Sequence, residues 1–417
     1  MSESMRCRGM TDMLPEDTMR FRRVEEAFRQ VCLGWGYAEV RTPTLERLHL
    51  FTAAGTLSPQ MLERVYSFLD WDGWSGERVV LRPDSTIPAA RLYTERLAGL
   101  PAAKLCYVQN VFRFAQGDES REDWQCGVEL IGDTQPQGDV ELILMACETL
   151  QALGLSAGVK LSDPGILRAI LVKGGFSLPE QIRLYDRVLD GDLAALGEVQ
   201  ERVPGLSPSL SGLLTVEGEA TEYLDNLRSA LVTEVPEIAR PLDELSAVSR
   251  VLTQIGVSHR IAPLLVRNFE YYTGPVFHLD VAGRKVGGGG RYDALISLVG
   301  GDTVPASGFA LEIDQIAALL TAEAAPEQAA VNIVCAAANG LDLGAAFALA
   351  LALRAAGRRV AVMAGASGSS RHRAVLAGRQ VVVAGGEFIL SGDGGKERRL
   401  TRVADVVRAV AGSASGG

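Results

Sequence analysis

The chain has 417 residues, 47% of them hydrophobic, which exceeds one comfortable core and predicts two domains, with room for an inserted third. Its formal net charge of −10 argues against a surface that coats nucleic acid, although a local basic face stays compatible with it. Six cysteines lie scattered without a Cys-x-x-Cys pair, which is typical of reduced thiols and unlike a disulfide framework or a zinc site.

Targeting and membrane signals are weak. The N-terminus lacks the apolar stretch of a secretory signal, and the Ala-rich stretch near 343–356 is interrupted by Arg354 and followed by Gly357. We therefore expect a soluble, cytoplasmic protein that does not bind membranes.

The first predicted element is an amphipathic helix at residues 18–34, where apolar residues recur every three to four positions before the stop "GWGY". Short segments rich in β-branched and aromatic residues follow, with helices such as 138–153 between them; these segments are 38–46, 78–86, 104–114 and 123–132. This order predicts a largely antiparallel sheet flanked by helices.

The chain changes character at residues 164–256, where Leu-rich helical periods with Pro and Gly breaks predict a helical insertion. Strand patterns then resume, and the acidic, Ala-rich 321–330 reads as a linker. Residues 331–411 alternate strand and helix patterns, which predicts a small α/β domain with a parallel sheet. From Glu327 onward the chain is mildly basic, with 11 Lys and Arg against 6 Asp and Glu, and the tail "GSASGG" is expected to be disordered.

Three adjacent polar residues, Asp84, Ser85 and Thr86, form a turn in "VLRPDSTIPAAR". Asp84 or Ser85 can cap the helix that follows, which is a purely structural explanation. The same turn aims a carboxylate and two hydroxyls at one point, which suits an ammonium group.

The segment 112–132 adds Arg113, a polar loop, and then Gln125 and Glu129 four residues apart. Because side chains on a strand alternate between faces, Gln125 and Glu129 are expected to share one face. A surface strand would explain this pair equally well.

The segment "LVRNFEYYTGPVF" (265–277) is interpreted as one strand that carries Arg267, Glu270, Tyr271 and Tyr272. Arg267 would be costly to bury unless it faced an anion. An arginine that reaches to the surface is the structural alternative.

Four consecutive glycines, Gly287 to Gly290, precede Arg291, Tyr292 and Asp293. The pattern matches neither the P-loop nor the dinucleotide-binding fingerprint, so the glycines alone favour either a close-approaching ligand or a tight turn or bulge between strands. The four histidines lie far apart without ligand spacing, so we expect them to be structural or exposed.

Taken in order, these segments resemble the core of the class II aminoacyl-tRNA synthetases, in particular histidyl-tRNA synthetase and its paralogue, the regulatory subunit of ATP phosphoribosyltransferase. The resemblance spans roughly residues 8–320 and begins with "RGMTDMLPED" and "EVRTPTLERLHLF". Its most specific parts, "LVRNFEYYTGPVF" and "GGGGRYDAL", look like the two histidine-recognition motifs of that family.

The resemblance implies an α+β fold: a class II antiparallel sheet flanked by helices in a histidine-binding domain at 1–320, with the helical insertion at about 164–256. After the linker at 321–330, the small α/β domain at 331–411 resembles a worn anticodon-binding domain.

The resemblance also implies how histidine would be held. Asp84 and Thr86 would lie at the α-amino group together with Gln125 and Glu129, and Ser85 belongs to the same histidine-binding set. Arg113 and Arg267 would lie near the carboxylate. The tyrosines that would flank the imidazole are Tyr271, Tyr272 and Tyr292.

The ATP half of the site departs from the ligase pattern. Where the ligase has a glutamate that reads adenine, this chain has Ala115; the loop is two residues shorter, and Glu119 takes the place of a phosphate-facing arginine. The closing motif has Glu312 and Gln315 instead of an ending in arginine. A charged hydrogen bond to phosphate contributes on the order of 1.5 to 3 kcal/mol, so two such losses predict a rate lower by roughly four or more orders of magnitude.

The sequence therefore favours a non-catalytic regulatory subunit that joins a short-form ATP phosphoribosyltransferase catalytic subunit, takes part in the first step of histidine biosynthesis and mediates feedback inhibition by L-histidine. The family implies a homodimer through the class II core and a hetero-octamer with the catalytic subunit. No metal, cofactor, catalytic residue or tRNA partner is expected. The alternatives are an active histidine–tRNA ligase and a stand-alone histidine sensor or another synthetase-derived paralogue.

Overall fold

The computed structural model describes the chain with internal gaps. The described residues are 5–53, 65–71, 76–115, 117, 119–132, 136–189, 192, 194–203, 205, 217–265, 272–320, 333–337, 342–364, 379–391 and 397–411. The predicted linker at 321–330, the tail at 412–417 and part of the 265–277 segment lie outside these ranges. The chain divides into two compact units, Met1–Ala324 and Ala325–Gly417.

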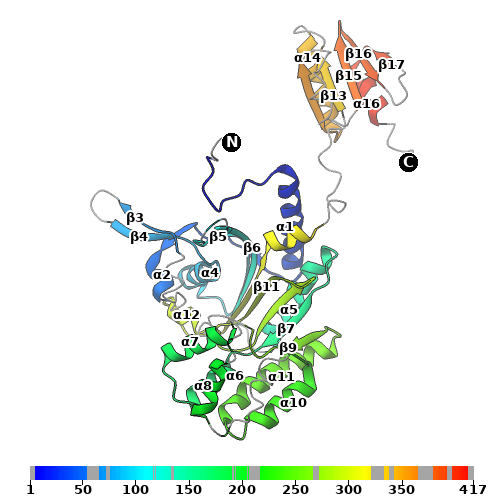
Figure 1. Cartoon of the computed structure of the whole chain (residues 1–417). Helices are drawn as coiled ribbons and strands as arrows, with labels where there is room; N and C mark the ends of the chain where they lie inside the picture. The colour runs from blue at the N-terminus through cyan, green and yellow to red at the C-terminus, as the bar shows by residue number, and fades with distance from the viewer. Residues whose placement is uncertain are drawn as a thin grey trace. The chain divides into compact units, whose positions relative to one another are not determined.

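A nine-stranded sheet forms the centre of the first unit (Figure 1). In spatial order its strands are β1 (Ala38–Glu39), β5 (Ala103–Phe112), β6 (Glu122–Ile131), β12 (Ala306–Glu312), β11 (Arg284–Arg291), β10 (Val276–Val281), β7 (Gly158–Ser162), β9 (His259–Ile261) and β8 (Gly218–Glu219). Only the pairs β1–β5 and β7–β9 are parallel among these described strands. The prediction of a largely antiparallel sheet flanked by helices is confirmed.

One face of this sheet is covered by α1 (Pro15–Gly34), α5 (Gln137–Ala152) and α13 (Ile313–Leu319). Helix α1 begins three residues before the predicted helix, because Pro15 occupies a first-turn position, where its missing N–H costs nothing. Apolar residues of the helices and of alternate strand positions form the main core on this side. We call this face the helix side.

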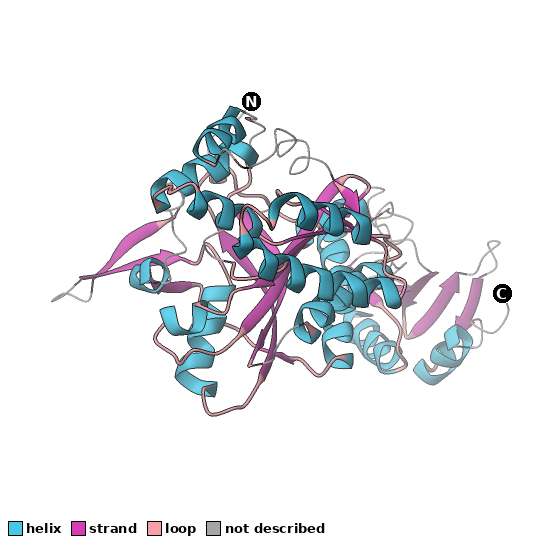
Figure 2. Ribbon diagram, turned by 90° about the horizontal axis from the view of Figure 1, so that it is seen from below, coloured by secondary structure: helices cyan, strands magenta, loops and turns pink. Residues whose placement is uncertain are grey.

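The opposite face carries a smaller apolar cluster, built around α4 (Thr86–Leu92), the π-helical turn η1 (Tyr93–Leu97) and α12 (Leu295–Leu298). Beside it lie α2 (Leu48–Ala53) and a three-stranded sheet of β2 (Leu45–Arg47), β4 (Gly76–Leu81) and β3 (Ser67–Trp71). Figure 2 shows helices against the strands of the large sheet from both sides.

Leu-rich helical periods at residues 164–256 correspond to a group of helices next to the β7–β9 edge. They are α6 (Gly165–Lys173), α7 (Leu178–Leu189), α8 (Ala194–Arg202), α10 (Ala220–Leu231), η2 (Pro236–Ile238) and α11 (Ala239–Gln254). We call this group the helical insertion. No described helix of the chain is long and apolar enough to cross a membrane.

The second unit contains β13 (Ile333–Ala337), α14 (Leu343–Ala355), β14 (Val360–Ala364), β15 (Arg379–Ala384), β16 (Glu387–Ser391), β17 (Glu397–Leu400) and α16 (Val403–Ala411). Its sheet is mixed: β13, β14 and β15 are parallel, whereas β16 and β17 pair antiparallel. The prediction of a parallel sheet holds for β13, β14 and β15 but was wrong for β16 and β17. Gly385 and Gly386 both adopt positive φ, which makes a two-residue hairpin turn out of a segment that reads as one continuous strand.

Candidate functional site

The candidate site lies on the face of the large sheet opposite the helix side. Gln125 and Glu129 share this face of β6, as strand alternation predicts, and both are buried, with 7% and 1% of their surface exposed. The alternative of a surface strand is therefore wrong. On the neighbouring strands, Gln125 is aligned with Gln109 of β5 and with Glu312 of β12.

Glu129 is a buried, strongly perturbed acid of the site. The hydroxyl of Tyr107 donates to its Oε1 at 2.9 Å, and the hydroxyl of Tyr292 donates to its Oε2. Burial raises the pKa of Glu129 well above its usual range, and the charge of Asp84 adds to the rise; hydrogen bonds from Tyr107 and Thr86 oppose it. Among the described residues, no Lys or Arg forms an ion pair with this carboxyl group.

Small residues of three neighbouring strands lie beside Glu129. We call them the small-residue floor; they are Gly127, Gly288, Gly290, Gly308 and Ala310. A Cβ at Gly308 would lie 2.2 Å from Glu129 Oε2 and 2.4 Å from the Tyr292 hydroxyl. A Cβ at Gly127 would lie 2.4 Å from the Tyr107 ring. These two glycines therefore allow the two tyrosines to reach Glu129.

The four-glycine run lies within β11, where it pairs on both sides with β10 and β12. The alternative of a tight turn at these glycines is wrong, because Gly287 to Gly290 pair in the ladder with both neighbours. The register shifts directly before the run, where Leu279 pairs with Gly287 and Asp280 with Lys285, so Val286 of β11 is the extra residue of a bulge or irregularity. A Cβ at Gly289 would lie 2.0 Å from the Gly308 carbonyl oxygen, and one at Gly288 would lie 2.5 Å from the Phe277 carbonyl oxygen. Glycine is required because the neighbouring backbones approach closely.

Asp84, Ser85 and Thr86 precede and begin α4. The Oδ1 of Asp84 accepts a hydrogen bond from the Ile87 N–H at 2.8 Å, so the helix-capping interpretation holds for Asp84. Burial raises the pKa of Asp84, and the Arg113 charge opposes the rise. The Ser85 hydroxyl is buried and has no hydrogen-bond partner in the described part of the chain.

Arg113 follows directly after β5 and is anchored beside this turn. Its Nε donates to the Pro83 carbonyl at 2.9 Å, and its Nη1 lies 4.0 Å from Asp123 Oδ2. The side chain is 32% exposed, so its guanidinium keeps contact with solvent.

The predicted tyrosines are only partly described. Tyr292 is buried and bonds Glu129, whereas Arg267 and Tyr271 lie outside the described residues. Tyr272 precedes β10, so its placement within a strand was wrong: Gly274 and Pro275 separate it from Val276, where β10 begins. Burial raises the pKa of Tyr272, and the charges of Asp84 and Glu129 raise it further, which places all three groups in one electrostatic neighbourhood.

The opposite end of the site is acidic. The Asp314 carboxylate accepts from the Trp124 N–H at 2.8 Å, and burial together with the charges of Asp123 and Glu312 raises its pKa. In the short loop after Arg113, Ala115 is buried and Glu119 is exposed.

Arg121 of the same loop is engaged by the loop itself. Its Nε donates to the Ala115 carbonyl at 3.0 Å, and its guanidinium stacks on the Phe114 ring at 4.7 Å from the centroid. Carboxylates and cations lie together at this end, since Arg113 is 4.0 Å from Asp123 and the charges of Glu312 and Asp280 act on Lys285.

Tyr107 is a site residue that the sequence interpretation missed. It stands one alternation step from Gln109 on β5 and lies directly across from Gly127. The strand period that paired Gln125 with Glu129 would have found it, had it been applied to the neighbouring strand. Within the described ranges, no group of three or more His, Cys, Asp or Glu side chains is arranged to hold a metal ion.

His259 is a structural histidine, as expected, whereas His372 lies outside the described residues. His259 begins β9 and is buried beside α11, where Ser249 Oγ lies 2.8 Å from its Nε2 and the Val257 carbonyl lies 2.9 Å from its Nδ1. Both ring nitrogens are therefore used within the fold.

Comparisons with known proteins agree on one family. The model of the histidyl-tRNA synthetase family matches residues 9–316. An ATP phosphoribosyltransferase regulatory subunit from Dehalococcoides mccartyi is 49% identical over 76% of this chain and 78% of its own length. A histidine–tRNA ligase from Methanosarcina acetivorans is 35% identical over 75% and 74%.

Solved structures confirm the class II fold. A Bacillus halodurans protein described as an ATP phosphoribosyltransferase regulatory subunit/histidyl-tRNA synthetase superposes with a TM-score of 0.76 at 27% identity and covers 92% of this chain and 100% of its own. A Nostoc histidyl-tRNA synthetase gives a TM-score of 0.71 at 18% identity, covering 98% and 99% of the two chains, which supports the fold alone.

Proposed function

Because the chain belongs to the histidyl-tRNA synthetase family, we propose that it is the regulatory subunit of an ATP phosphoribosyltransferase and binds L-histidine at the candidate site without activating it. The similarity to named regulatory subunits supports the regulatory role. The chemistry of the site supports the ligand.

The observation that carries the proposal is the buried Glu129, bonded by Tyr107 and Tyr292 and paired with no described cation. A buried carboxyl group in this setting is stabilised by a ligand that brings a positive charge or strong donors. Asp84 is a second acid with a raised pKa in the same neighbourhood. Histidine offers an α-ammonium group and an imidazole with two nitrogens, and the tyrosine rings suit its planar side chain.

The small-residue floor leaves nothing larger than a methyl group on that part of the sheet face, beside the acids. We assign Thr86 and Asp84 to the α-ammonium group, together with Gln125 and Glu129. Arg113 suits the carboxylate, because its guanidinium is held by the Pro83 carbonyl and stays partly exposed. Arg267 and Tyr271 belong to the same proposal and lie outside the described residues.

The adenylation half is proposed to be lost. Ala115 offers no side-chain acceptor for adenine, and three carboxylates, Asp123, Glu312 and Asp314, compete with a polyphosphate for the two cations at this end, Arg113 and Lys285. Arg121, a cation of the same loop, is engaged by Ala115 and Phe114.

Feedback requires that histidine bind one state of the assembly more tightly than another, since only differential affinity shifts an equilibrium. The proposed partner is a short-form catalytic subunit, with this chain dimerising through its class II core in a hetero-octamer. L-Histidine is the effector, and the setting is the cytoplasmic first step of histidine biosynthesis.

The test is reconstitution with a short-form catalytic subunit and an assay of ATP condensation with phosphoribosyl pyrophosphate. We expect activity that depends on this chain and is inhibited by L-histidine but not by D-histidine. Activity of the catalytic subunit that is indifferent to this chain would refute the regulatory role.

Binding is measured separately by titration calorimetry with Tyr107→Phe and a matched control, Tyr37→Phe. Tyr37 is also buried and donates to a glutamate, Glu141, at 2.8 Å, outside the candidate site. The loss of one hydrogen bond to a charged group predicts about tenfold weaker histidine binding for Tyr107→Phe alone.

An active histidine–tRNA ligase is the second candidate, favoured by the match of the family model and by ligases that are 31 to 35% identical. It requires ATP to bind at the acidic end of the site. The two candidates thus differ in a measurable reaction, the histidine-dependent exchange of ATP and pyrophosphate.

A further inference from the structure

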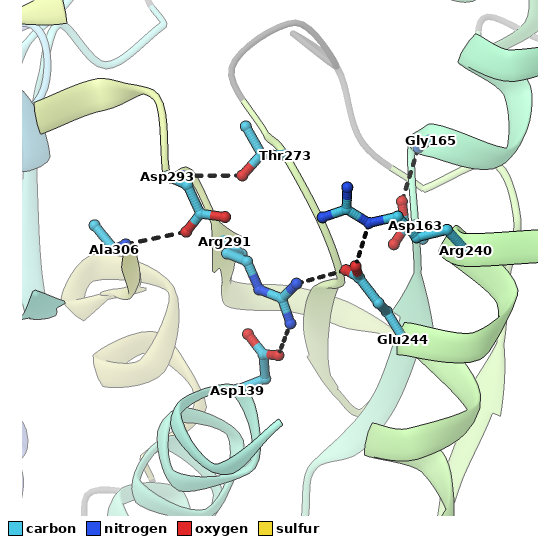
Figure 3. Close-up of polar contacts among 9 residues, drawn as sticks. All are labelled: Asp139, Asp163, Gly165, Arg240, Glu244, Thr273, Arg291, Asp293 and Ala306. Atoms are coloured by element: carbon cyan, nitrogen blue, oxygen red, sulfur yellow. Dashed lines mark hydrogen bonds and ion pairs between the residues drawn. The ribbon is translucent and has the colours of Figure 1, made fainter. Parts of the chain in front are cut away.

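Arg291, the last residue of β11, is the largest fully buried side chain of the chain's described part, with 1% of its surface exposed. Its Nη1 donates to Glu244 Oε2 at 2.5 Å, and its Nη2 donates to Asp139 Oδ2 (Figure 3). Asp139 lies in the first turn of α5, and Glu244 lies on α11 of the helical insertion. One guanidinium therefore ties a strand of the sheet to the insertion.

Arg291 and Tyr292 are adjacent but serve opposite sides of the sheet. Arg291 bonds Asp139 and Glu244 on the helix side, whereas Tyr292 bonds Glu129 in the candidate site. A displacement of this short segment on one face of the sheet therefore also displaces the contacts on the other face.

A second link starts from Arg168 of α6, whose Nη2 donates to the Tyr272 carbonyl at 2.8 Å. Tyr272 is joined to Tyr292 through the next residue: the Thr273 N–H donates to the Arg291 carbonyl at 2.8 Å, and the Asp293 N–H donates to Thr273 Oγ1 at 2.9 Å. Figure 3 shows Thr273 and Asp293 beside Arg291. Two helices of the insertion thus restrain the backbone of this segment: α11 acts next to Tyr292, and α6 acts at Tyr272.

The ion pairs around Arg291 depend on the position of α11 relative to β11. Glu244 also accepts from Arg240 Nε at 2.8 Å, and Asp163, bonded to the Gly165 N–H at 2.8 Å, adds a further buried carboxyl group. One oxygen of Asp139 and one of Asp163 are buried without a hydrogen-bond partner among the described residues. A buried guanidinium between two carboxylates is favourable only in good geometry, so this group specifies one position of α11 against β11.

We propose that ligand binding at Tyr292 and Tyr272 stabilises two helices of the insertion, α11 and α6. Two positioning residues, Arg291 and Arg168, would carry this effect. This proposal rests on histidine binding at the site, as proposed above. The ligand fixes the two tyrosines, and the arginine links carry that restraint to helices that do not contact the ligand.

The test is hydrogen–deuterium exchange of the full chain with and without saturating L-histidine. Exchange of peptides from α6 (165–173) and α11 (239–254) is expected to slow about tenfold, within the range typical of coupling between linked sites. In Glu244→Gln, which keeps the shape of the side chain and removes its charge, calorimetric affinity for histidine stays within about threefold while the slowing in α11 is lost.

Asp243→Asn is the matched control, because Asp243 is the neighbour on α11 but is exposed and pairs with Arg228. It should keep the slowing of the wild type. Arg168→Met provides an independent variant should Glu244→Gln fail to fold, and it should lose the slowing in α6.

Histidine that binds the wild type without slowing exchange in either helix would overturn this inference and leave the proposed function intact. Absence of binding by calorimetry would instead overturn the proposed function. Slowing that survives in both Glu244→Gln and Arg168→Met would show that the coupling does not pass through these links and would overturn the inference.

Discussion

Glu129→Gln separates histidine binding from stability. In the unliganded protein the carboxyl group of Glu129 is buried and has two tyrosine hydroxyls as donors but no described cation as a partner. A charged hydrogen bond to the ligand contributes about 1.5 to 3 kcal/mol, so its loss predicts histidine binding roughly 10- to 150-fold weaker.

The same substitution, which weakens histidine binding, should leave the free energy of unfolding unchanged or raise it. Burial raises the folded-state pKa of Glu129 above its ordinary value, so the wild type loses stability as the pH rises from that ordinary value toward the folded one. Glutamine does not titrate. The free energy of unfolding of Glu129→Gln should therefore match that of the wild type near pH 5 and equal or exceed it near pH 8.

Titration calorimetry and urea unfolding at both pH values measure the two effects. Glu141→Gln is the matched control, since Glu141 also accepts from a tyrosine, Tyr37, but pairs with Lys104 at 2.6 Å. The control should keep histidine affinity. Unchanged affinity in Glu129→Gln, or lower stability at pH 8 than at pH 5 relative to the wild type, would refute the argument.

Three further predictions concern the same unit. Burial raises the pKa of Asp163 to about 7 from 3.8, so Asp163→Asn should gain stability relative to the wild type as the pH rises from 4 to 8, by up to roughly 4 kcal/mol in urea titrations; a constant difference would contradict this. Gly308→Ala should abolish histidine binding in calorimetry because its Cβ meets Glu129 and Tyr292, whereas Gly197→Ala, with nothing within 4 Å, should bind normally. Arg291→Met leaves the buried Asp139 carboxylate without its cation, while Glu244 keeps Arg240, and should lower the free energy of unfolding by about 3 to 5 kcal/mol; a loss below 1 kcal/mol would count against the ion-pair assignment.

The periodic parts of the fold could be predicted from the sequence. Apolar spacing gave α1 and α5, and period-two alternation placed Gln125 and Glu129 on one face of β6. Local turn chemistry was harder: two glycines at 385 and 386 convert an apparent strand into a hairpin, and Gly274 and Pro275 end the segment that was interpreted as one strand with β10. The domain boundaries at 320 and 331 stay predictions.

The polar contacts between residues far apart in the sequence could not be predicted from the sequence. Arg291 is 152 residues from Asp139 and 47 from Glu244, and no periodicity links positions on three separate elements. The pattern of the Gly-rich run left both a ligand and a turn or bulge open, whereas Gly289 is required because the neighbouring backbone approaches closely. Such contacts are set by the sheet order, which places β11 between β12 and β10.

The most direct test of the central claim is histidine-dependent exchange of ATP and pyrophosphate, run on the same preparation that is shown by calorimetry to bind L-histidine. An intact histidine–tRNA ligase serves as the positive control. The account predicts clear histidine binding with no exchange above the histidine-free background, because Ala115 and Glu119 stand where the resemblance leads one to expect an adenine-reading glutamate and a phosphate-facing arginine. Exchange at a rate comparable to that of the ligase would contradict it.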